Sequence, residues 1–302
     1  EVSTSWSTSR PVARPSAGAP VSRIRSRIDD TTTKQVSGTI GRYRAAMQIS
    51  GKTVLLTGAS GGLGQAIGRS MAAAGANLVI TARNVAQLDD LSLATGAEVI
   101  VADLCNRADV ESLAARAGDI DILVANAGTG ADVLLPDETP DNIDRVIDVN
   151  LRSPMHLATA FAQRKLQSGA PAHIVFVGSL SGLAATPTTR LYNATKFGLR
   201  GFALSLREDL HGTAIGVSIV EPGFIRDAGM FAESGIALPK GVRTKSPADV
   251  ARGVIGAIEG DKGEVFVAPL ELRLSATLAT VAPAFSSRIQ RAIDTAGMKG
   301  TK

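Results

Sequence analysis

The chain has 302 residues, of which 44% are hydrophobic, and this length and composition allow one large globular domain. Its single cysteine, Cys105, excludes an internal disulfide and is typical of a reducing compartment, so we expect a cytoplasmic protein. Three scattered histidines form no cluster of metal ligands, and we expect no metal site. The sequence holds no run of about 20 apolar residues that could span a bilayer.

The formal net charge of +4 is concentrated near the N-terminus. Residues 1–46 hold eight lysines and arginines but three acidic residues, which leaves residues 47–302 close to neutral. That part shows no basic face with interleaved aromatic residues. The sequence therefore predicts no nucleic-acid partner.

Residues 1–46 are rich in Ser, Thr, Arg and Pro and show no apolar period, which predicts a largely disordered extension. An Arg- and Ser-rich leader with few acidic residues is also typical of an organelle transit peptide. A solvated extension and an upstream mis-start are the alternatives. Met47 would then begin the compact part of the chain.

From Lys52 onward, short β-branched runs alternate with Ala/Leu-rich segments of helical length. The runs are too apolar for half-exposed strands, so they predict strands buried on both faces of a parallel sheet. Right-handed crossovers then give a single Rossmann-type, doubly wound α/β sheet with helices on both faces. The predicted strands are TVLLT (53–57), NLVIT (77–81), AEVIVA (97–102), DILVAN (121–126), HIVFVG (173–178), GVSIV (216–220) and EVFVA (264–268).

A glycine-rich turn, TGASGGLGQAIG (57–68), follows the first predicted strand directly. Glycines let the backbone approach a pyrophosphate closely, and the N-terminus of the next helix points free N–H groups at that anion. The position between a first strand and a first helix favours a dinucleotide site over a purely structural turn. The predicted contacts of this loop are Gly58, Ser60, Gly62, Leu63 and Gly64.

The residues after the second strand bear on the choice of dinucleotide. Ala82 and Arg83 stand where an NAD-preferring protein usually keeps a carboxylate for the adenosine ribose. Without that carboxylate the 2′-phosphate of NADP is not repelled, and Arg83 can pair with it. The sequence therefore predicts NADP, with NAD as the alternative; Arg83 could instead cap the next helix. The ends of the third and fourth strands add the predicted contacts Asp103, Leu104, Asn126, Ala127 and Gly128.

Further along, LYNATKFGL (191–199) places a tyrosine one helical turn before a lysine, on one face of a helix. Alone, this spacing fits an ordinary amphipathic helix equally well. With the other motifs, however, the chain resembles the short-chain dehydrogenase/reductase family over about residues 50–268. The motifs that carry the resemblance are Thr57-Gly58-x-x-x-Gly62-x-Gly64, Asn126-Ala127-Gly128, Asn150, Ser179, Tyr192-x-x-x-Lys196 and Pro222-Gly223.

The resemblance implies an NAD(P)-dependent oxidoreductase that moves a hydride between a nicotinamide and an alcohol or carbonyl compound. Tyr192 would transfer the proton, while Lys196 would lower the pKa of Tyr192 and hold the nicotinamide ribose. Ser179 would bond the substrate oxygen, and Asn150 would bind a water in a proton relay. Structural interpretations stay open for two of these residues: Asn150 could bond backbone at a helix irregularity, and Ser179 could simply end a strand.

After Pro222 and Gly223 the family often has a threonine that bonds the carboxamide of the cofactor, but this sequence has Asp227. We expect the backbone of Ile225 to take that role. Residues 224–245 would then form the substrate loop. Its apolar side chains, which favour an apolar substrate or else pack the loop onto the domain, are Met230, Phe231, Ile236 and Leu238.

These motifs predict three parts: a disordered extension (1–46), a dinucleotide-binding catalytic domain (47–268) and a C-terminal helical tail (269–302). In the tail, apolar residues recur at near-helical spacing from Leu270 to Ile293, with Pro283 as a kink or restart. We expect this helix to pack on its own domain; a dimer contact, a substrate lid and a membrane-surface helix are the alternatives.

Family membership would further imply a homodimer or homotetramer that acts on a small-molecule alcohol or carbonyl compound. The alternatives are a catalytically silent NADP-binding sensor or scaffold and a nucleotide-sugar epimerase or dehydratase. The intact Ser179, Tyr192 and Lys196 argue against the first. The glycine spacing and the short region after Pro222 argue against the second.

Overall fold

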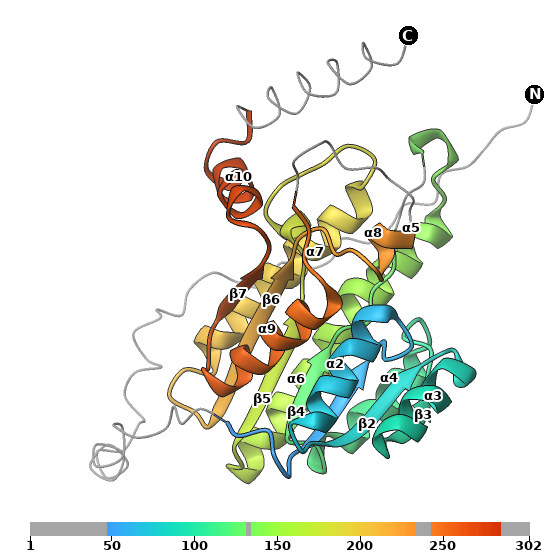
Figure 1. The fold of residues 1–302 in the computed structure, drawn as a ribbon, viewed down its shortest axis with the longest axis vertical. Coiled ribbons are helices and arrows are strands. Elements are labelled where there is room, and N and C mark those ends of the chain that lie inside the picture. Colours follow the sequence, from blue (N-terminus) through green and yellow to red (C-terminus); the bar gives the residue numbers. More distant parts are fainter. Residues whose placement is uncertain (1–46, 131–133, 234–242, 285–302) are drawn as a thin grey trace, which may run out of the picture. The chain divides into compact units, whose positions relative to one another are not determined.

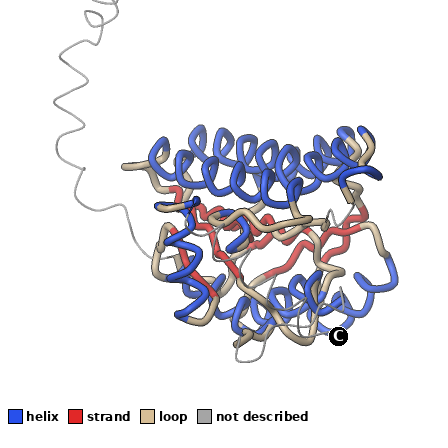
Figure 2. The backbone as a smooth tube through the Cα atoms, turned by 90° about the horizontal axis from the view of Figure 1, so that it is seen from above, coloured by secondary structure: helices blue, strands red, loops and turns tan. Residues whose placement is uncertain are grey.

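The computed structural model describes residues 47–130, 134–233 and 243–284. These residues form a seven-stranded parallel sheet with the order β3-β2-β1-β4-β5-β6-β7. Figure 1 traces the elements along the chain, and Figure 2 shows helices in a layer on either side of the strands. The doubly wound α/β fold expected from the sequence is confirmed. The strands are β1 (Thr53–Thr57), β2 (Asn77–Ala82), β3 (Glu98–Val101), β4 (Ile122–Ala125), β5 (Ala172–Val177), β6 (Ile215–Pro222) and β7 (Glu264–Val267).

All seven predicted strands are present, and each bound lies within two residues of its expected position. The expectation of burial on both faces holds for the central strands only. Strands β3 and β7 lie at the two edges of the sheet, where each has a single neighbour, and most of their residues are partly exposed.

A separate hydrophobic core covers each face of the sheet. Helices α2, α3 and α9 pack on one face, through Ile67, Leu88 and Val254 among others. Helices α4, α6 and α7 pack on the other face, where Phe161 and Leu199 are buried. The helices are α2 (Gly62–Ala73), α3 (Val85–Thr95), α4 (Arg107–Ala115), α5 (Pro140–Ile147), α6 (Ser153–Ser168), α7 (Arg190–Asp209), α8 (Met230–Glu233), α9 (Pro247–Glu259) and α10 (Leu270–Val281).

The strand order places a natural binding edge between β1 and β4. From β1 the chain continues outward to β2 and β3, whereas β4 begins the other half of the sheet. Connections therefore leave these two neighbouring strands in opposite directions at their carboxyl ends. In open α/β sheets this divergence creates the crevice in which ligands bind.

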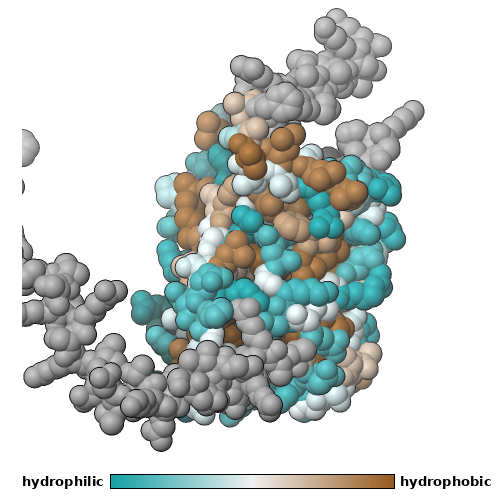
Figure 3. Space-filling model, turned by 90° about the vertical axis from the view of Figure 1, so that its left-hand side faces the viewer, coloured by the Kyte–Doolittle hydropathy of each residue, from teal (hydrophilic) through white to brown (hydrophobic). Residues whose placement is uncertain are grey.

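The tail helix α10 packs on its own domain through small residues rather than through its leucines. It ends at Val281, two residues before Pro283, as expected for a residue that cannot continue a helix. The apolar side chains on its outer side are 43–80% exposed: Leu270, Leu274, Leu278 and Val281. The buried residues are Ala276 and Ala279, and Oγ1 of Thr280 donates to the carbonyl oxygen of Leu183 at 3.1 Å. The helix therefore packs on its own domain as expected, but it does so through small residues, while the leucine row faces outward. Figure 3 shows apolar surface gathered in the upper part of the face it displays, toward α10.

The predicted division at residues 46/47 and 268/269 stays a prediction, since residues 1–46 and 285–302 lie outside the described part of the chain. None of the helices in that part combines the length and the apolar composition that a bilayer-spanning helix needs. The same residues contain no group of three or more His, Cys, Asp or Glu side chains that could hold a metal ion.

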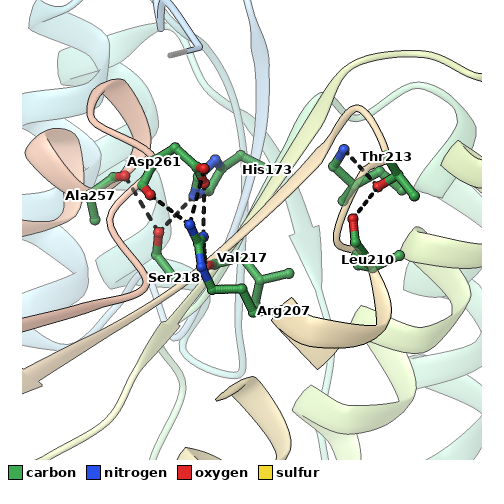
Figure 4. Close-up of polar contacts among 9 residues, drawn as sticks. His173, Arg207, Leu210, Thr213, Val217, Ser218, Ala257 and Asp261 are labelled. Carbon is green, nitrogen blue, oxygen red and sulfur yellow. Dashed lines mark hydrogen bonds and ion pairs between the residues drawn. The ribbon is translucent and has the colours of Figure 1, made fainter. Parts of the chain in front are cut away.

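Figure 4 shows a buried polar cluster around His173, which is the second residue of β5, and Ser218, which lies in the middle of β6. The Nε2 atom of His173 lies 2.8 Å from Oγ of Ser218, which contacts the carbonyl oxygen of Ala257 at 3.4 Å. Beside them, Arg207 forms a 2.8 Å ion pair with Asp261. His173 is 2% exposed, so its imidazole is held in the core.

This burial makes the stability of the protein depend on pH. It lowers the pKa of His173 from 6.5 to about 4, so between these values the unfolded chain binds the proton and the folded chain does not. The free energy of unfolding should therefore fall as pH drops through this window, by about 2 kcal/mol between pH 7 and pH 5. Urea unfolding of the wild type and of His173→Gln at both pH values measures the difference. An equal pH dependence in the two proteins would contradict the assignment.

Candidate active site

The glycine loop between β1 and α2 packs backbone to backbone against the end of β4. Gly58 has a φ of 65°, and a Cβ atom on it would lie 2.6 Å from Cα of Ala127. A Cβ atom on Gly64 would collide with the carbonyl oxygen of Gly58. Any side chain at these two positions would therefore force the loop apart.

Asn126 fixes this loop from the end of β4. Its Nδ2 donates to the carbonyl oxygens of Thr57 and Gly58 at 3.0 and 3.1 Å. In return, the backbone amides of Asn126 and Ala127 donate to Oγ1 of Thr57, both at 3.1 Å. The side chain predicted to contact a cofactor thus has the observed task of shaping the glycine loop.

The start of α2 is open toward an anion. Its N-cap is Gly61, which contributes no side-chain bond, and the first turn carries no acidic residue. The amides of the first turn therefore keep their capacity for a pyrophosphate, which the helix dipole also favours. The uncapped helix and the tight glycine loop together fit the phosphates of a dinucleotide.

A cleft of about 630 Å³ runs along this edge of the sheet, within the size range of small-molecule sites. It brings most of the predicted site residues together. Those lining the cleft are Gly58, Ser60, Gly62, Leu63, Gly64, Arg83, Asp103, Leu104, Asn126, Ala127, Gly128, Tyr192 and Lys196.

Arg83 lies exposed at the end of β2, where it lines the cleft. The N-cap of α3 is Asn84, whose side chain accepts a hydrogen bond from the amide of Gln87 at 3.3 Å. The interpretation of Arg83 as the cap of this helix is therefore wrong, since its neighbour has that role.

Tyr192 and Lys196 lie one turn apart on α7, and both line the cleft. Lys196 is 3% exposed, and its Nζ donates to the carbonyl oxygen of Val177 at 2.9 Å. The same Nζ lies 5.6 Å from the centre of the Tyr192 ring. Burial lowers the pKa of Lys196 to about 8, and the charge of Glu221 opposes this decrease.

Ser179 stands just past the end of β5, at the start of the 3₁₀ turn Leu180–Gly182. Its backbone N–H donates to Oε2 of Glu221. Its Oγ accepts a bond from the amide of Ser181 at 3.1 Å. Ser179 follows the last strand residue, Val177, by two positions, and a carboxylate from the neighbouring strand holds its backbone.

Asn150 is fully buried in a π-turn, Asp148–Arg152, that joins α5 to α6. Its Nδ2 donates to the carbonyl oxygen of Thr129 at 2.9 Å, and its Oδ1 accepts from the amide of Thr129 at 2.7 Å. These bonds fit the interpretation of Asn150 as a backbone partner at a helix irregularity. Its Nδ2 also donates to a side chain, Oγ1 of Thr195, at 3.2 Å, and the relay role stays a prediction. A Cβ atom on Gly128 would lie 3.6 Å from Oδ1 of Asn150 and 3.8 Å from Nζ of Lys196, so both side chains also border the same glycine.

The remaining predicted residues lie outside the set that lines the cleft, and these are Asn150, Ser179, Pro222, Gly223 and Ile225. The backbone around Ile225 forms an isolated bridge to Lys245, through bonds made by Phe224 and Arg226. Neither bond involves the amide of Ile225. Asp227 has a φ of 72° and forms an exposed ion pair with Arg226 at 3.3 Å.

Of the apolar residues expected in the substrate loop, Met230 lines the cleft. The side chain of Phe231 and the residues Ile236 and Leu238 lie outside the described part of the chain.

Two charged residues at the site were not foreseen from the sequence. Arg145 of α5 lines the cleft and donates to Oγ1 of Thr129 at 2.9 Å. Glu221 is completely buried, next to Ser179. An acidic residue within the apolar run SIVEPG was an available signal for Glu221, because a buried charge is costly unless its surroundings compensate for it.

Comparison with known proteins decides the family. The family model for short chain dehydrogenases matches residues 52–237, more than half of the chain. The chain belongs to the short-chain dehydrogenase/reductase family. Similar members include the ketoacyl reductase HetN of Nostoc sp., 32% identical over 228 residues (72% of this chain and 79% of the relative). The 1-deoxy-11-beta-hydroxypentalenate dehydrogenase of Streptomyces avermitilis is 36% identical over 234 residues (73% and 86%).

Solved structures of short-chain dehydrogenases/reductases share the fold. One from Sphingobium yanoikuyae, in complex with NADPH, has a TM-score of 0.66 and 28% identity, covering 80% of this chain and 95% of its own. The bulky-bulky ketone specific alcohol dehydrogenase from Comamonas testosteroni has a TM-score of 0.65 and 26% identity, covering 78% and 94%.

As a short-chain dehydrogenase/reductase, the protein is an oxidoreductase that uses a nicotinamide cofactor and acts on small molecules. Nothing in these similarities supports the alternative of a catalytically silent sensor.

Proposed function

We propose that this protein interconverts an apolar carbonyl compound and its alcohol with NADP as the preferred cofactor, and that Tyr192 transfers the proton. One observation carries the proposal: Tyr192 and Lys196 line the same cleft as the glycine loop. The phenol and the dinucleotide-binding turn thus share one space.

A bound nicotinamide supplies the hydride chemistry. Tyr192 donates its proton to the carbonyl oxygen in reduction and takes one from the alcohol in oxidation. The nearby ammonium of Lys196 favours the ionised phenol. Of the three donors on Lys196, one is used by Val177, so the others can hold ribose hydroxyls.

Ser179 orients the substrate oxygen. Because its Oγ accepts a bond from the amide of Ser181, the hydroxyl keeps its own proton to donate to that oxygen. Asn150 is retained as the water-binding residue of a proton relay. This role is supported by the positions of two side-chain atoms: Oδ1 of Asn150 and Nζ of Lys196 both lie beside Gly128.

The test is a screen of the purified protein with NADPH and ketones of increasing bulk, including 3-oxoacyl thioesters, followed by the absorbance of the reduced cofactor. The ketoacyl reductase and bulky-ketone relatives motivate this panel, and Met230 in the cleft wall favours its apolar members. We expect turnover of bulky apolar carbonyls. Cofactor binding without turnover of any carbonyl would contradict the proposed activity.

The preference for NADP rests on Arg83, which lines the cleft with no carboxylate before it. Because this arginine is exposed, we expect NADPH to bind about tenfold more tightly than NADH, or ~1.4 kcal/mol. Ala82→Asp combined with Arg83→Ala should reverse the order, since a carboxylate accepts from the 2′-hydroxyl and repels a 2′-phosphate.

Titration of both cofactors against both proteins measures the preference. Arg107→Ala, at an exposed arginine on α4, is the control and should bind as the wild type does. Tighter binding of NADH to the wild-type protein would refute the assignment to Arg83 without affecting the hydride-transfer chemistry.

Two further properties belong to the proposal. A homodimer or homotetramer is supported by the exposed leucines of α10, since soluble monomers rarely keep a large apolar surface in water; the mass in solution checks this. A cytoplasmic location is supported by the single, unpaired Cys105.

A further inference from the structure

Glu221 brings a carboxyl group into the core directly beneath the proposed catalytic residues. It is the next-to-last residue of β6, and its exposed fraction is 0%. Val220 pairs with Val177 in the sheet, so Glu221 stands beside Gly178, where a Cβ atom would collide with Oε2 of Glu221. The missing side chain of Gly178 thus makes room for the carboxyl group.

The two oxygens of this carboxyl group have different surroundings. Oε2 accepts the backbone N–H of Ser179. Oε1 is buried and has no hydrogen-bond partner among the described residues. A half-satisfied carboxyl group in the core lowers stability. An apolar residue at this position would make the core more stable. A functional role would therefore account for the presence of a glutamate.

The basic residues around Glu221 lie on helix α7, and the acidic residues lie on the strands that this helix covers. Lys196 and Arg200 lie four residues apart on α7, which places them on one face of the helix. The register of β6 and β7 puts Glu221 and Glu264 on one face of the sheet, under this helix. Glu264 pairs with Arg200 at 2.6 Å. Glu221 is thereby the acidic residue that balances Lys196.

The charged groups that face Glu221 come from the elements packed around it. Lys196 and Arg200 face it from α7 and Glu264 faces it from β7, while α9 covers the other side of the sheet. Burial raises the pKa of Glu221 to about 8, and the Ser179 N–H and the Lys196 ammonium oppose this rise. Each member of the Glu221–Lys196 pair thus favours the charged form of the other.

We propose that Glu221 is a positioning residue of this enzyme, which holds the backbone of Ser179 at the end of β5 and keeps Lys196 protonated. The inference rests on the proposed function, in which Ser179 and Lys196 act on substrate and cofactor. Two distinct effects follow, one on geometry through Ser179 and one on charge through Lys196.

Glu221→Gln tests the charge, because the amide keeps the shape and an acceptor oxygen for Ser179. Carbonyl reduction needs a protonated Tyr192 and fails at alkaline pH. Because the pKa of Glu221 is about 8, its carboxyl group carries a negative charge on the alkaline side of this value. Removing that charge makes the Tyr192–Lys196 pair release protons more readily. The alkaline limb of the pH profile should therefore move to lower pH, with the affinity for NADPH changed by no more than about threefold.

Glu221→Asp tests the geometry, because it keeps the charge but is one methylene too short to reach the Ser179 N–H. It should leave the alkaline limb in place and reduce kcat by about tenfold or more. Glu98→Gln is the matched control: it removes a strand carboxylate that pairs with an arginine, Arg116, at the opposite edge of the sheet, and it should behave as the wild type in both respects.

A readout on the cofactor-free protein separates the contact from activity. The Ser179 amide resonance in ¹⁵N-labelled protein should titrate with the Glu221 carboxyl group in the wild type and show no such titration in Glu221→Gln. The inference is overturned if the amide titrates equally in both, or if Glu221→Gln keeps the wild-type alkaline limb while Ser179→Ala is impaired. If Ser179→Ala is itself unimpaired, the proposed function fails instead.

Discussion

Replacement of Tyr192 by phenylalanine is expected to abolish turnover while leaving the affinity for NADPH nearly unchanged. The change removes one oxygen atom and keeps the ring that contacts the Lys196 ammonium. The lost hydroxyl is the group that we propose moves the proton. General acid–base catalysis typically contributes a factor of about 10² to 10⁴, so kcat should fall at least a hundredfold.

Steady-state kinetics and a cofactor titration on the same preparation separate the two effects. The chain has one other tyrosine, Tyr43, and Tyr43→Phe should match the wild type because it lies outside the predicted catalytic domain. If the kcat of Tyr192→Phe lies within a few-fold of the wild-type value, Tyr192 does not transfer the proton.

Lys196→Met is expected to damage both turnover and cofactor binding. Methionine resembles lysine in length and suits a position that is 3% exposed, so the helix should keep its packing. The variant loses the ammonium that favours ionised Tyr192 and the donors assigned to the ribose. We expect kcat to fall by about a hundredfold or more and the dissociation constant of NADPH to rise by about tenfold.

The chain offers a matched control in Lys165 of α6. It is also buried, at 4% exposure, and its Nζ donates to a backbone carbonyl, that of Gly118, at 3.2 Å. Because Lys165 lies outside the cleft lining, Lys165→Met should alter stability without altering catalysis per folded molecule. Normal cofactor binding by Lys196→Met would remove the ribose role and leave the proton-transfer role to be judged by kcat.

The fold could be predicted because its signals are local. The runs LVI in β2 and ILVA in β4 are apolar at every position, as expected for short strands that are covered on both faces. The spacing of Tyr192 and Lys196 is likewise set by helical pitch, and the glycine loop by the turn that follows β1. The glycine loop and helix α7 contribute many of the residues that line the cleft.

The features that escaped prediction depend on which residues meet in space. The contact between Glu221 and Ser179 joins residues 42 positions apart and depends on the register of β5 and β6. The leucine row of α10 has the same helical period whether it faces a core or the surface, so its spacing could not show that it is exposed. Arg83 and Asn84 are neighbours, and here the sequence did hold a signal that was missed, because asparagine is a preferred N-cap residue and arginine is not.

The π-turn Asp148–Arg152 fixes the number of residues that the chain must have between α5 and α6. A π-turn holds one residue more than an α-helical turn, and each residue advances a helix by about 100°. Loss of a single residue here would merge α5 and α6 into one regular helix and rotate one against the other by that angle. With Ser153 and Phe161 anchored in the core, α5 would turn Arg145 away from Thr129. Exposed side chains of this segment can therefore vary. A deletion or insertion within it would instead displace α5 and with it Arg145, which lines the cleft.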